Sequence, residues 1–179
     1  MAGTLKVGTI TTPSGSGSIT IPSGVTLSGQ NYPAFHVNLN GDQTLSDATA
    51  AKIQFNREVF DTNSAFDSTT NYRFTVPSNG AGKYFIYSNI LLSSSALSTT
   101  EQVIGYIYVN GSDRMQSYAF DIRNTAGNKA NAILTATLDL SVGDYVEIYG
   151  YINVTSGTVK AEGARSDDTT CFGGYRIGA

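Results

Sequence analysis

Short segments of alternating side chains, each closed by a turn sequence, limit the fold of this chain more than any other feature. In residues 72–76 (YRFTV), large apolar side chains take one face and polar ones the other, as successive residues of a strand do. The stretch SNGAG follows, and VNGS, NTAGN and SVGD separate later segments in the same way. The predicted strands are 34–39, 51–55, 72–76, 83–92, 102–109, 114–122, 130–140, 145–154, 158–161 and 170–177. Many short strands joined by polar turns predict an all-β antiparallel sandwich or jelly roll, in which residues 46–51 form at most a turn.

Three of these strands carry apolar or tyrosine side chains on both faces. They are residues 83–92, 102–109 and 145–154. The interior of one sandwich covers only one face of a strand, so the second face predicts another buried surface, between subunits. Tyrosine suits such a surface because it combines a large contact area with little rotamer entropy and a polar tip. We therefore assign the subunit interface to Tyr106, Tyr108, Tyr145, Tyr149 and Tyr151, and the alternatives are scattered exposed tyrosines or a tyrosine-rich ligand surface.

The composition limits the possible partners. The chain has 179 residues, about one domain, and 11 basic against 14 acidic side chains give a formal net charge of −3. This charge provides no basic patch for nucleic acid. No segment approaches the roughly 18 apolar residues of a membrane span, and the opening MAGTLKVGTI lacks the apolar core of a secretory signal. We expect no nucleic-acid partner and no membrane insertion, and we expect the chain to be made and kept in a cytoplasm.

The residue types that carry catalysis are sparse. Cys171 and His36 are the only cysteine and histidine, so the sequence offers neither an internal disulfide nor a zinc-binding cluster. No Gly-x-Ser-x-Gly segment occurs. Most carboxylates that could form a glycosidase pair stand beside Gly or Ser in turns, where Asp bonds to nearby backbone; the candidates are Asp113, Asp121, Asp139, Asp144, Glu147, Glu162, Asp167 and Asp168. We predict that the protein is not an enzyme and uses no cofactor.

Calcium is the one metal for which the sequence offers candidate ligands. Asp167 with Asp168, or Asp42 with Asp47, would supply the hard oxygen atoms that calcium prefers. Neither pair has a distinctive ligand spacing, so no metal site is assigned.

The first part of the chain differs in composition from the rest. Residues 1–31 consist mainly of Gly, Ser, Thr and Pro around thin apolar patches, and such a stretch cannot build its own core. Its β-branched residues can instead add strands to another protein surface. We interpret residues 1–31 as an extended anchor arm and 32–179 as a jelly-roll domain, and the alternative for the arm is a disordered tail or linker. The anchoring residues are Leu5, Val7, Ile10, Ile19 and Ile21.

The order of motifs in residues 33–179 resembles the jelly roll shared by the complement globular-head domain and the tumour necrosis factor (TNF) superfamily. Phe55, Asp61 and Phe66 keep the opening spacing of the complement signature, and Phe74 and the segment GKYFI at 82–86 follow. This chain departs from that signature because Phe74 comes one residue late, the next loop is two residues longer and Ile86 replaces a final Phe.

Three further segments carry the same resemblance. Asn110-Gly111 stands where that fold makes a central hairpin, LSVGDYV at 140–146 resembles its strand entrance, and TCFGGYRI at 170–177 resembles its closing strand. The resemblance implies a trimeric head, in which aromatic side chains left outside the sandwich meet neighbouring subunits around a threefold axis.

The arm resembles the starts of small virion proteins of tailed bacteriophages, in the segments LKVGTI and GSGSITIPSG. Together the two resemblances imply a phage virion structural protein, assembled in the host cytoplasm: a homotrimeric knob attached to capsid or tail proteins by its arm, as capsid decoration, head fibre or short tail fibre. The alternative is a receptor- or glycan-binding head that recognises the host surface. Its contacts would come from loops away from the anchor, because loops on a rigid scaffold tolerate variation; the candidates are residues 61–70, 93–100, 124–129 and 162–168.

Overall fold

The computed structural model describes residues 32–120, 123, 128–164 and 169–178, and all of the regular structure in these ranges is β-strand. The predicted arm, with Leu5, Val7, Ile10, Ile19 and Ile21, lies outside the described residues. The strands are β1 (Ala34–Asn38), β2 (Gln43–Leu45), β3 (Ala51–Lys52), β4 (Arg57–Asp61), β5 (Phe66–Asp67), β6 (Arg73–Thr75), β7 (Gly82–Ser94), β8 (Thr100–Val109), β9 (Ser112–Phe120), β10 (Lys129–Leu140), β11 (Tyr145–Val154), β12 (Val159–Ala161) and β13 (Cys171–Gly178).

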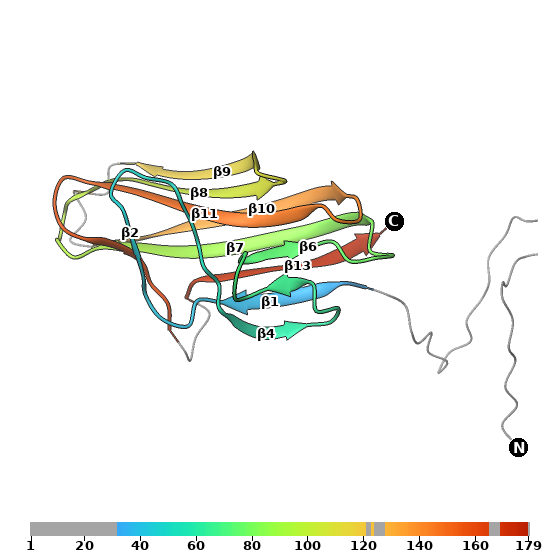
Figure 1. The fold of residues 1–179 in the computed structure, drawn as a ribbon. Coiled ribbons are helices and arrows are strands. Elements are labelled where there is room, and N and C mark those ends of the chain that lie inside the picture. Colours follow the sequence, from blue (N-terminus) through green and yellow to red (C-terminus); the bar gives the residue numbers. More distant parts are fainter. Residues whose placement is uncertain (1–31, 121–122, 124–127, 165–168, 179) are drawn as a thin grey trace, which may run out of the picture. The chain divides into compact units, whose positions relative to one another are not determined.

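The strands form two antiparallel sheets that pack face to face (Figure 1). The seven-stranded sheet has the order β2-β12-β7-β13-β1-β4, with β10 paired to the other side of β7. The six-stranded sheet has the order β5-β6-β11-β8-β9, and β3 pairs with β11. The predicted all-β jelly roll is confirmed.

The inward faces of the long strands form the core. In β7 and β11 every second residue is buried, including Tyr84, Ile86, Ile148 and Ile152. Gly105 of β8 lets the sheets approach, because a Cβ atom there would lie 2.9 Å from the Cβ of Ala132 on β10. Alternation therefore settles which face points inward, and it leaves the opposite face of each long strand outside the sandwich.

Phe66 and Phe74 of the complement-like signature meet Phe172 of the closing segment in one cluster around Phe35 of β1. The ring of Phe35 stacks on Phe74 at 4.5 Å between centroids and lies 5.6 Å from Phe66 and 4.9 Å from Phe172. Asp61 positions this cluster, since its carboxylate accepts a hydrogen bond of 2.7 Å from the backbone N–H of Phe66. The motif spacing thus reflects how four separate strands place their rings in one core.

Three short strands were not predicted, namely β2, β4 and β5, and the predicted strand at 51–55 is reduced to β3. The side chain of Gln43 causes the shortening. Its amide nitrogen donates to the carbonyl of Lys52 and its oxygen accepts from the N–H of Gln54, both at 2.8 Å. These bonds occupy backbone groups that a longer strand would offer to a neighbouring strand. The segment at 46–51 contains a turn at Asp47 and Ala48, as expected.

The predicted central hairpin joins β8 to β9 through Asn110 and Gly111, which have φ angles of 52° and 75°. The Asn110 side chain accepts a hydrogen bond from the N–H of Tyr145 and donates one to the carboxylate of Asp144. Asp144 in turn accepts from the N–H of Ser141. These bonds explain why asparagine in the hairpin and the GDY sequence before β11 occur together.

Candidate functional site

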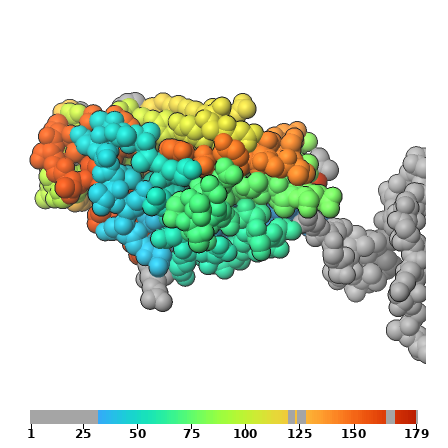
Figure 2. Space-filling view, viewed as in Figure 1, coloured from blue at the N-terminus to red at the C-terminus, as the bar shows by residue number. Residues whose placement is uncertain are grey.

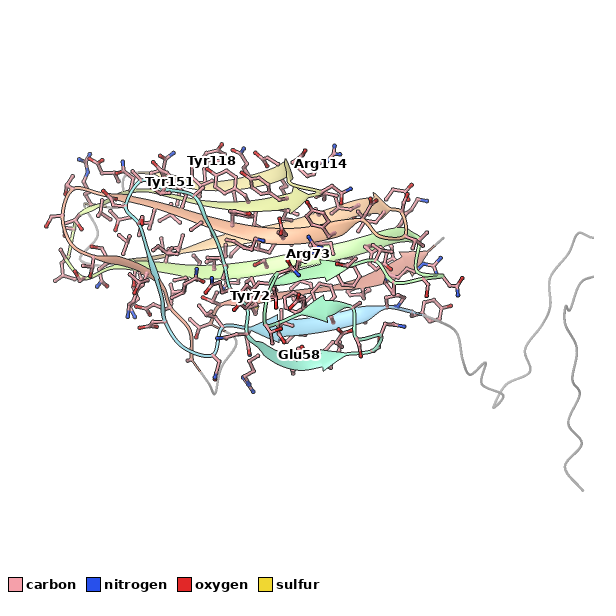
Figure 3. The ribbon with its side chains drawn as sticks, in the orientation of Figure 1. Glu58, Tyr72, Arg73, Arg114, Tyr118 and Tyr151 are labelled. Atoms are coloured by element: carbon pink, nitrogen blue, oxygen red, sulfur yellow. The ribbon has the colours of Figure 1, made fainter. Side chains whose placement is uncertain are left out.

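The outer face of the six-stranded sheet carries a group of tyrosines that we call the tyrosine face. It consists of Tyr106 and Tyr108 on β8, Tyr149 and Tyr151 on β11, and Tyr118 on β9. Tyr106 lies opposite Tyr149 in the β8–β11 ladder. The ring centroids of Tyr106 and Tyr108 are 6.0 Å apart, and those of Tyr108 and Tyr149 are 4.5 Å apart. Figure 3 shows Tyr118 and Tyr151 projecting from the layer formed by β8, β9 and β11.

Cationic side chains from neighbouring strands hold this face in place. Lys52 of β3 forms an ion pair of 2.5 Å with the buried carboxylate of Glu147, and its ammonium lies 6.0 Å from the ring centroid of Tyr149. Arg73 of β6 lies 4.1 Å above the ring of Tyr145, which therefore stands at the margin of the face. The half-buried rings of the tyrosine face are thus packed against groups of their own chain.

The carboxylate of Glu101 also has partners at this face. Asn153 donates to the carboxylate of Glu101, and Arg123 binds the same carboxylate at 3.0 Å. Burial raises the pKa of the Tyr106 and Tyr149 hydroxyls, because it disfavours the phenolate form. The face therefore presents protonated hydroxyls between rings.

A second aromatic group, which we call the aromatic strip, crosses the outer face of the seven-stranded sheet. It runs from Phe60 on β4 through His36 on β1 and Tyr87 and Phe85 on β7 to Tyr175 on β13. Successive ring centroids are 5.6 to 6.3 Å apart. The Nδ1 atom of His36 lies 2.9 Å from the hydroxyl of Tyr87. The sequence predicts that the second face of 83–92, which carries Phe85 and Tyr87, is buried between subunits. The sequence pattern does not show that Phe60, His36 and Tyr175 adjoin that face.

The aromatic strip is more exposed than the tyrosine face. Phe60 is 48% exposed and Tyr175 47%, and Ile133 on the neighbouring strand β10 is 64% exposed. On the tyrosine face only Tyr118 reaches this range. Large exposed apolar side chains that are neighbours on one face are typical of a surface that meets another protein.

Gly173 of β13 lets Tyr87 lie across the seven-stranded sheet. A Cβ atom at Gly173 would come within 2.3 Å of the Tyr87 hydroxyl and 2.9 Å of the carbonyl oxygen of Phe35. The absence of a side chain at Gly173 therefore allows the Tyr87 ring to lie against the sheet at the centre of the aromatic strip.

The carboxylates considered for catalysis have local partners wherever the structure describes them. Glu147 pairs with Lys52, Glu162 with Lys129, Asp139 with Lys83, and Asp113 contacts Gln116, while Asp144 caps the turn described above. Asp121, Asp167 and Asp168 lie outside the described residues. His36 belongs to the aromatic strip, and Cys171 is a buried thiol in β13. The members of this set that the structure describes are thus engaged with other partners rather than with one another.

The calcium candidates within the described residues are separately engaged. Asp42 forms an ion pair of 2.6 Å with Lys160, which lowers the pKa of this carboxyl group, and Asp47 accepts a hydrogen bond from the N–H of Val154. Over residues 32–120, 123, 128–164 and 169–178, no cluster of three His, Cys, Asp or Glu side chains suits a metal ion.

A small cavity of about 290 Å³ lies beside the β8–β9 hairpin. Its polar lining includes Asn110, Arg114, Thr137, Asp139 and Asp144. Since Asn110 and Asp144 already bond to each other, the cavity offers few unengaged groups to a ligand.

The loops proposed for recognition lie at both ends of the head. Residues 61–70 begin beside Ala34 at the start of β1, where the N–H of Thr62 donates to the Ala34 carbonyl. Residues 93–100, the described end of 124–129 and the start of 162–168 instead adjoin the far end of β7. The segment 61–70 is therefore next to the point where the chain enters the head, and the other three are remote from it.

No helix in the described part of the chain has the length and apolar character needed to cross a membrane. In Figure 2, β9 (yellow) lies along the top of the visible face, and the segment from β4 to β6 (green) lies along its lower part.

Comparison with known sequences gives two relatives from Bacillus subtilis (strain 168). Phage-like element PBSX protein XkdV is 30% identical over 132 residues, and the uncharacterized protein YqcC is 32% identical over 127 residues. The matches cover 70% and 66% of this chain but only 18% and 32% of the relatives, so the chain spans less than a third of either. No family of known proteins matches the chain.

Comparison with solved structures identifies the fold. The globular domain of zebrafish complement 1qA protein matches with a TM-score of 0.55 and 18% identity, over 81% of this chain and 97% of that one. Murine APRIL (TM-score 0.58, 12% identity) and Eiger TNF from S. frugiperda (0.58, 14%) each match 82% of this chain, and 100% and 91% of their own. The described head therefore has the jelly-roll fold of complement 1q and TNF proteins, and the chain is related in sequence to a protein of a phage-like element.

Proposed function

We propose that the protein is a phage virion structural protein: a homotrimeric knob attached to the particle by its N-terminal arm, as capsid decoration, head fibre or short tail fibre. The observation that carries this proposal is the sequence similarity to a phage-like element protein over 132 residues, in a chain with a TNF-like fold. The resemblance to that superfamily implies a trimer. The proposal includes no catalytic activity, in keeping with the locally paired carboxylates.

The contact between subunits can use only one of the two outer faces. The two outer faces of one subunit point in opposite directions. If one outer face bound the opposite face of the next subunit, the contact would repeat as an open stack. A closed ring instead needs two contact patches that are inclined to each other on each subunit. A trimer therefore combines one outer face with an edge of the sandwich. The sequence-based assignment to Tyr106, Tyr108, Tyr145, Tyr149 and Tyr151 places the tyrosine face at this contact, and it stays a prediction.

The exposed apolar area favours the aromatic strip for this role. Burying apolar surface stabilises association by about 25 cal/mol for each Å² removed from water, so an exposed face gains more than one already packed within its own chain. Phe60 and Tyr175 offer such surface at the two ends of the strip. We propose that the strip receives the β10 edge of the next subunit, where Ile133 is the most exposed large side chain.

The arm is the proposed attachment to capsid or tail proteins, through Leu5, Val7, Ile10, Ile19 and Ile21. A chain that begins at Asn31 should fold, form trimers and fail to join particles, while the full chain should do all three. Light scattering gives the number of subunits, and mass spectrometry of purified particles gives incorporation. Aggregation of the shortened chain, or its appearance in particles, would contradict the arm assignment.

Copy number separates the structural role from the alternative, a receptor- or glycan-binding head. A decoration protein should be present in hundreds of copies for each particle, and a receptor-binding fibre in a few tens at most. The same mass spectra, calibrated against the major capsid protein, give this number. Complete absence of the protein from particles would contradict both roles.

A further inference from the structure

If the heads meet through the seven-stranded sheet, as proposed above, the tyrosine face stays open to solvent in the trimer. Its rings come from three adjacent strands in register, since Ile104 of β8 lies opposite Tyr118 on one side and Tyr151 on the other. Tyr106 similarly lies between Gln116 and Tyr149. The face is therefore a grid of rings and amide or hydroxyl groups across β9, β8 and β11.

Three rings of this grid, Tyr106, Tyr108 and Tyr149, are packed against neighbouring groups before any ligand arrives. Tyr149 lies against Tyr108 at 4.5 Å between centroids and beneath the ammonium of Lys52 at 6.0 Å. Side chains that are already fixed lose little rotamer entropy on binding, and this loss is a main cost of forming a complex. The tyrosine face is thus prepared for a ligand in a way that freely rotating surface side chains are not.

The charge pattern of the face indicates the kind of ligand. The Lys52–Glu147 and Arg123–Glu101 pairs each cancel, so neither pair adds a net charge to the face. What remains is aromatic surface with tyrosine hydroxyls, which are protonated at neutral pH and can donate hydrogen bonds. The exposed apolar side chains that a protein interface prefers are concentrated on the opposite sheet.

Sugar rings match this combination. A pyranose has one face of C–H groups, which packs on an aromatic ring, and a rim of hydroxyls, which exchange hydrogen bonds with tyrosine hydroxyls and glutamine amides. We propose that the tyrosine face binds a neutral carbohydrate chain, with Tyr118 and Tyr151, which project from the sheet, as the stacking rings and Tyr106, Tyr149 and Gln116 as the hydrogen-bonding row between strands. The proposal rests on the proposed function, because it needs a trimer that leaves this sheet uncovered.

The chain reports on such binding directly, because it has 11 tyrosines and no tryptophan, so its intrinsic fluorescence comes from tyrosine alone. The full-length protein is titrated with maltohexaose, cellohexaose, chitohexaose and neutral wall polysaccharide extracted from host cells, and light scattering gives the number of subunits in each sample. We expect saturable quenching with at least one of these probes. Tyr118→Ala with Tyr151→Ala should weaken that binding about fivefold or more, because two aromatic contacts are lost.

Tyr175→Ala is the matched control, because Tyr175 is similarly exposed but lies on the seven-stranded sheet. It should leave carbohydrate binding unchanged, whether or not it weakens the trimer. Three results would overturn the inference: no probe binds at millimolar concentration, the Tyr118/Tyr151 variant binds as well as the parent, or that variant loses the trimer and so shows that the face is a subunit contact. Failure to find the protein in virions would overturn the proposed function alone, since carbohydrate binding is measured on the purified chain.

Discussion

The two outer faces of the head are built from the same kind of strand and both are aromatic. They differ in how far side chains of the same chain cover their rings. On the six-stranded sheet, Lys52 from β3 and Arg73 from β6 reach over the rings and pair with neighbours inside the chain. On the seven-stranded sheet, Phe60 and Tyr175 stay about half exposed. A run of aromatic side chains on an outer face therefore does not identify an interface until its partners within the chain are known.

The largest effect should come from placing charge on both sides of the proposed subunit contact, the aromatic strip and β10. Ile133→Glu with Tyr175→Glu should convert trimers to monomers, because like charges brought together in a desolvated contact cost several kcal/mol. Both side chains are exposed in the single subunit, so its circular dichroism should not change. Sedimentation velocity measures the subunit number.

Tyr118→Glu is the control for this pair, since Tyr118 is 51% exposed on the other sheet. It should leave the trimer intact. If the strip variant stays trimeric while Tyr149→Asp with Tyr151→Asp gives monomers, the tyrosine face is the subunit interface after all.

A smaller effect, on folding, should follow from Lys52→Met. This change leaves the buried carboxylate of Glu147 without its cation, and breaking such a pair should lower the free energy of unfolding by about 3 kcal/mol. Adding Glu147→Met should recover most of the loss, because two apolar side chains leave no unpaired charge. Urea denaturation gives these values.

Lys83→Met provides the comparison on the seven-stranded sheet. Lys83 and Asp139 lie 3.9 Å apart and are both exposed, so breaking this pair should change stability by less than about 1 kcal/mol. Equal losses of stability for Lys52→Met and Lys83→Met would mean that ion pairing within the chain stabilises the tyrosine face no more than it stabilises the seven-stranded sheet.

Gly173→Ala should cost about 1 to 3 kcal/mol, because the new methyl group displaces Tyr87 and presses on the backbone of Phe35. The hydrogen-bonded contact between His36 and Tyr87 should be lost at the same time, and assembly should weaken. Gly178→Ala in the same strand is the control, since no atom lies within 4 Å of its added Cβ. Thermal unfolding at fixed protein concentration compares the two, and similar midpoints would contradict the role of Gly173.

The smallest effect should appear at high pH. Burial raises the folded-state pKa of Tyr106 and Tyr149 above the unfolded value of about 10, so their contribution to stability is full below that pH and is lost as pH rises through the folded-state pKa. Tyr106→Phe with Tyr149→Phe should make the alkaline loss of stability less steep. Ultraviolet absorbance follows phenolate formation, and an unchanged slope in the variant would argue against these groups as its source.

The fold could be predicted from sequence where one short stretch carries the whole signal. Alternation in β7 and β11 is local, and so are the Asn110-Gly111 hairpin and the spacing that brings Phe66 and Phe74 together. The strand β4 escaped prediction because Val59 and Phe60 are both exposed at a sheet edge, so its pattern does not alternate between buried and solvated residues.

The surfaces were harder to predict because the contacts that cover their rings come from residues far apart in the chain. Lys52 meets Glu147, and His36 meets both Phe60 and Tyr87, through sheet registers that no short window of sequence contains. The tyrosines of β8 and β11 could be identified as an unusual face from their alternation alone. Whether that face is packed by its own chain or by another could not.

The register of β1 with β13 has a consequence for how such a head spreads among proteins. Ala34, at the start of β1, lies opposite Tyr175, near the end of β13, so the backbone enters and leaves the sandwich side by side. A domain with adjacent ends can be inserted into a loop, or joined to either terminus of another protein, without opening a strand pair. Recombination can therefore transfer the whole head as one segment. The recipient protein can join it through short connections, because both ends of the head lie at the same place on its surface.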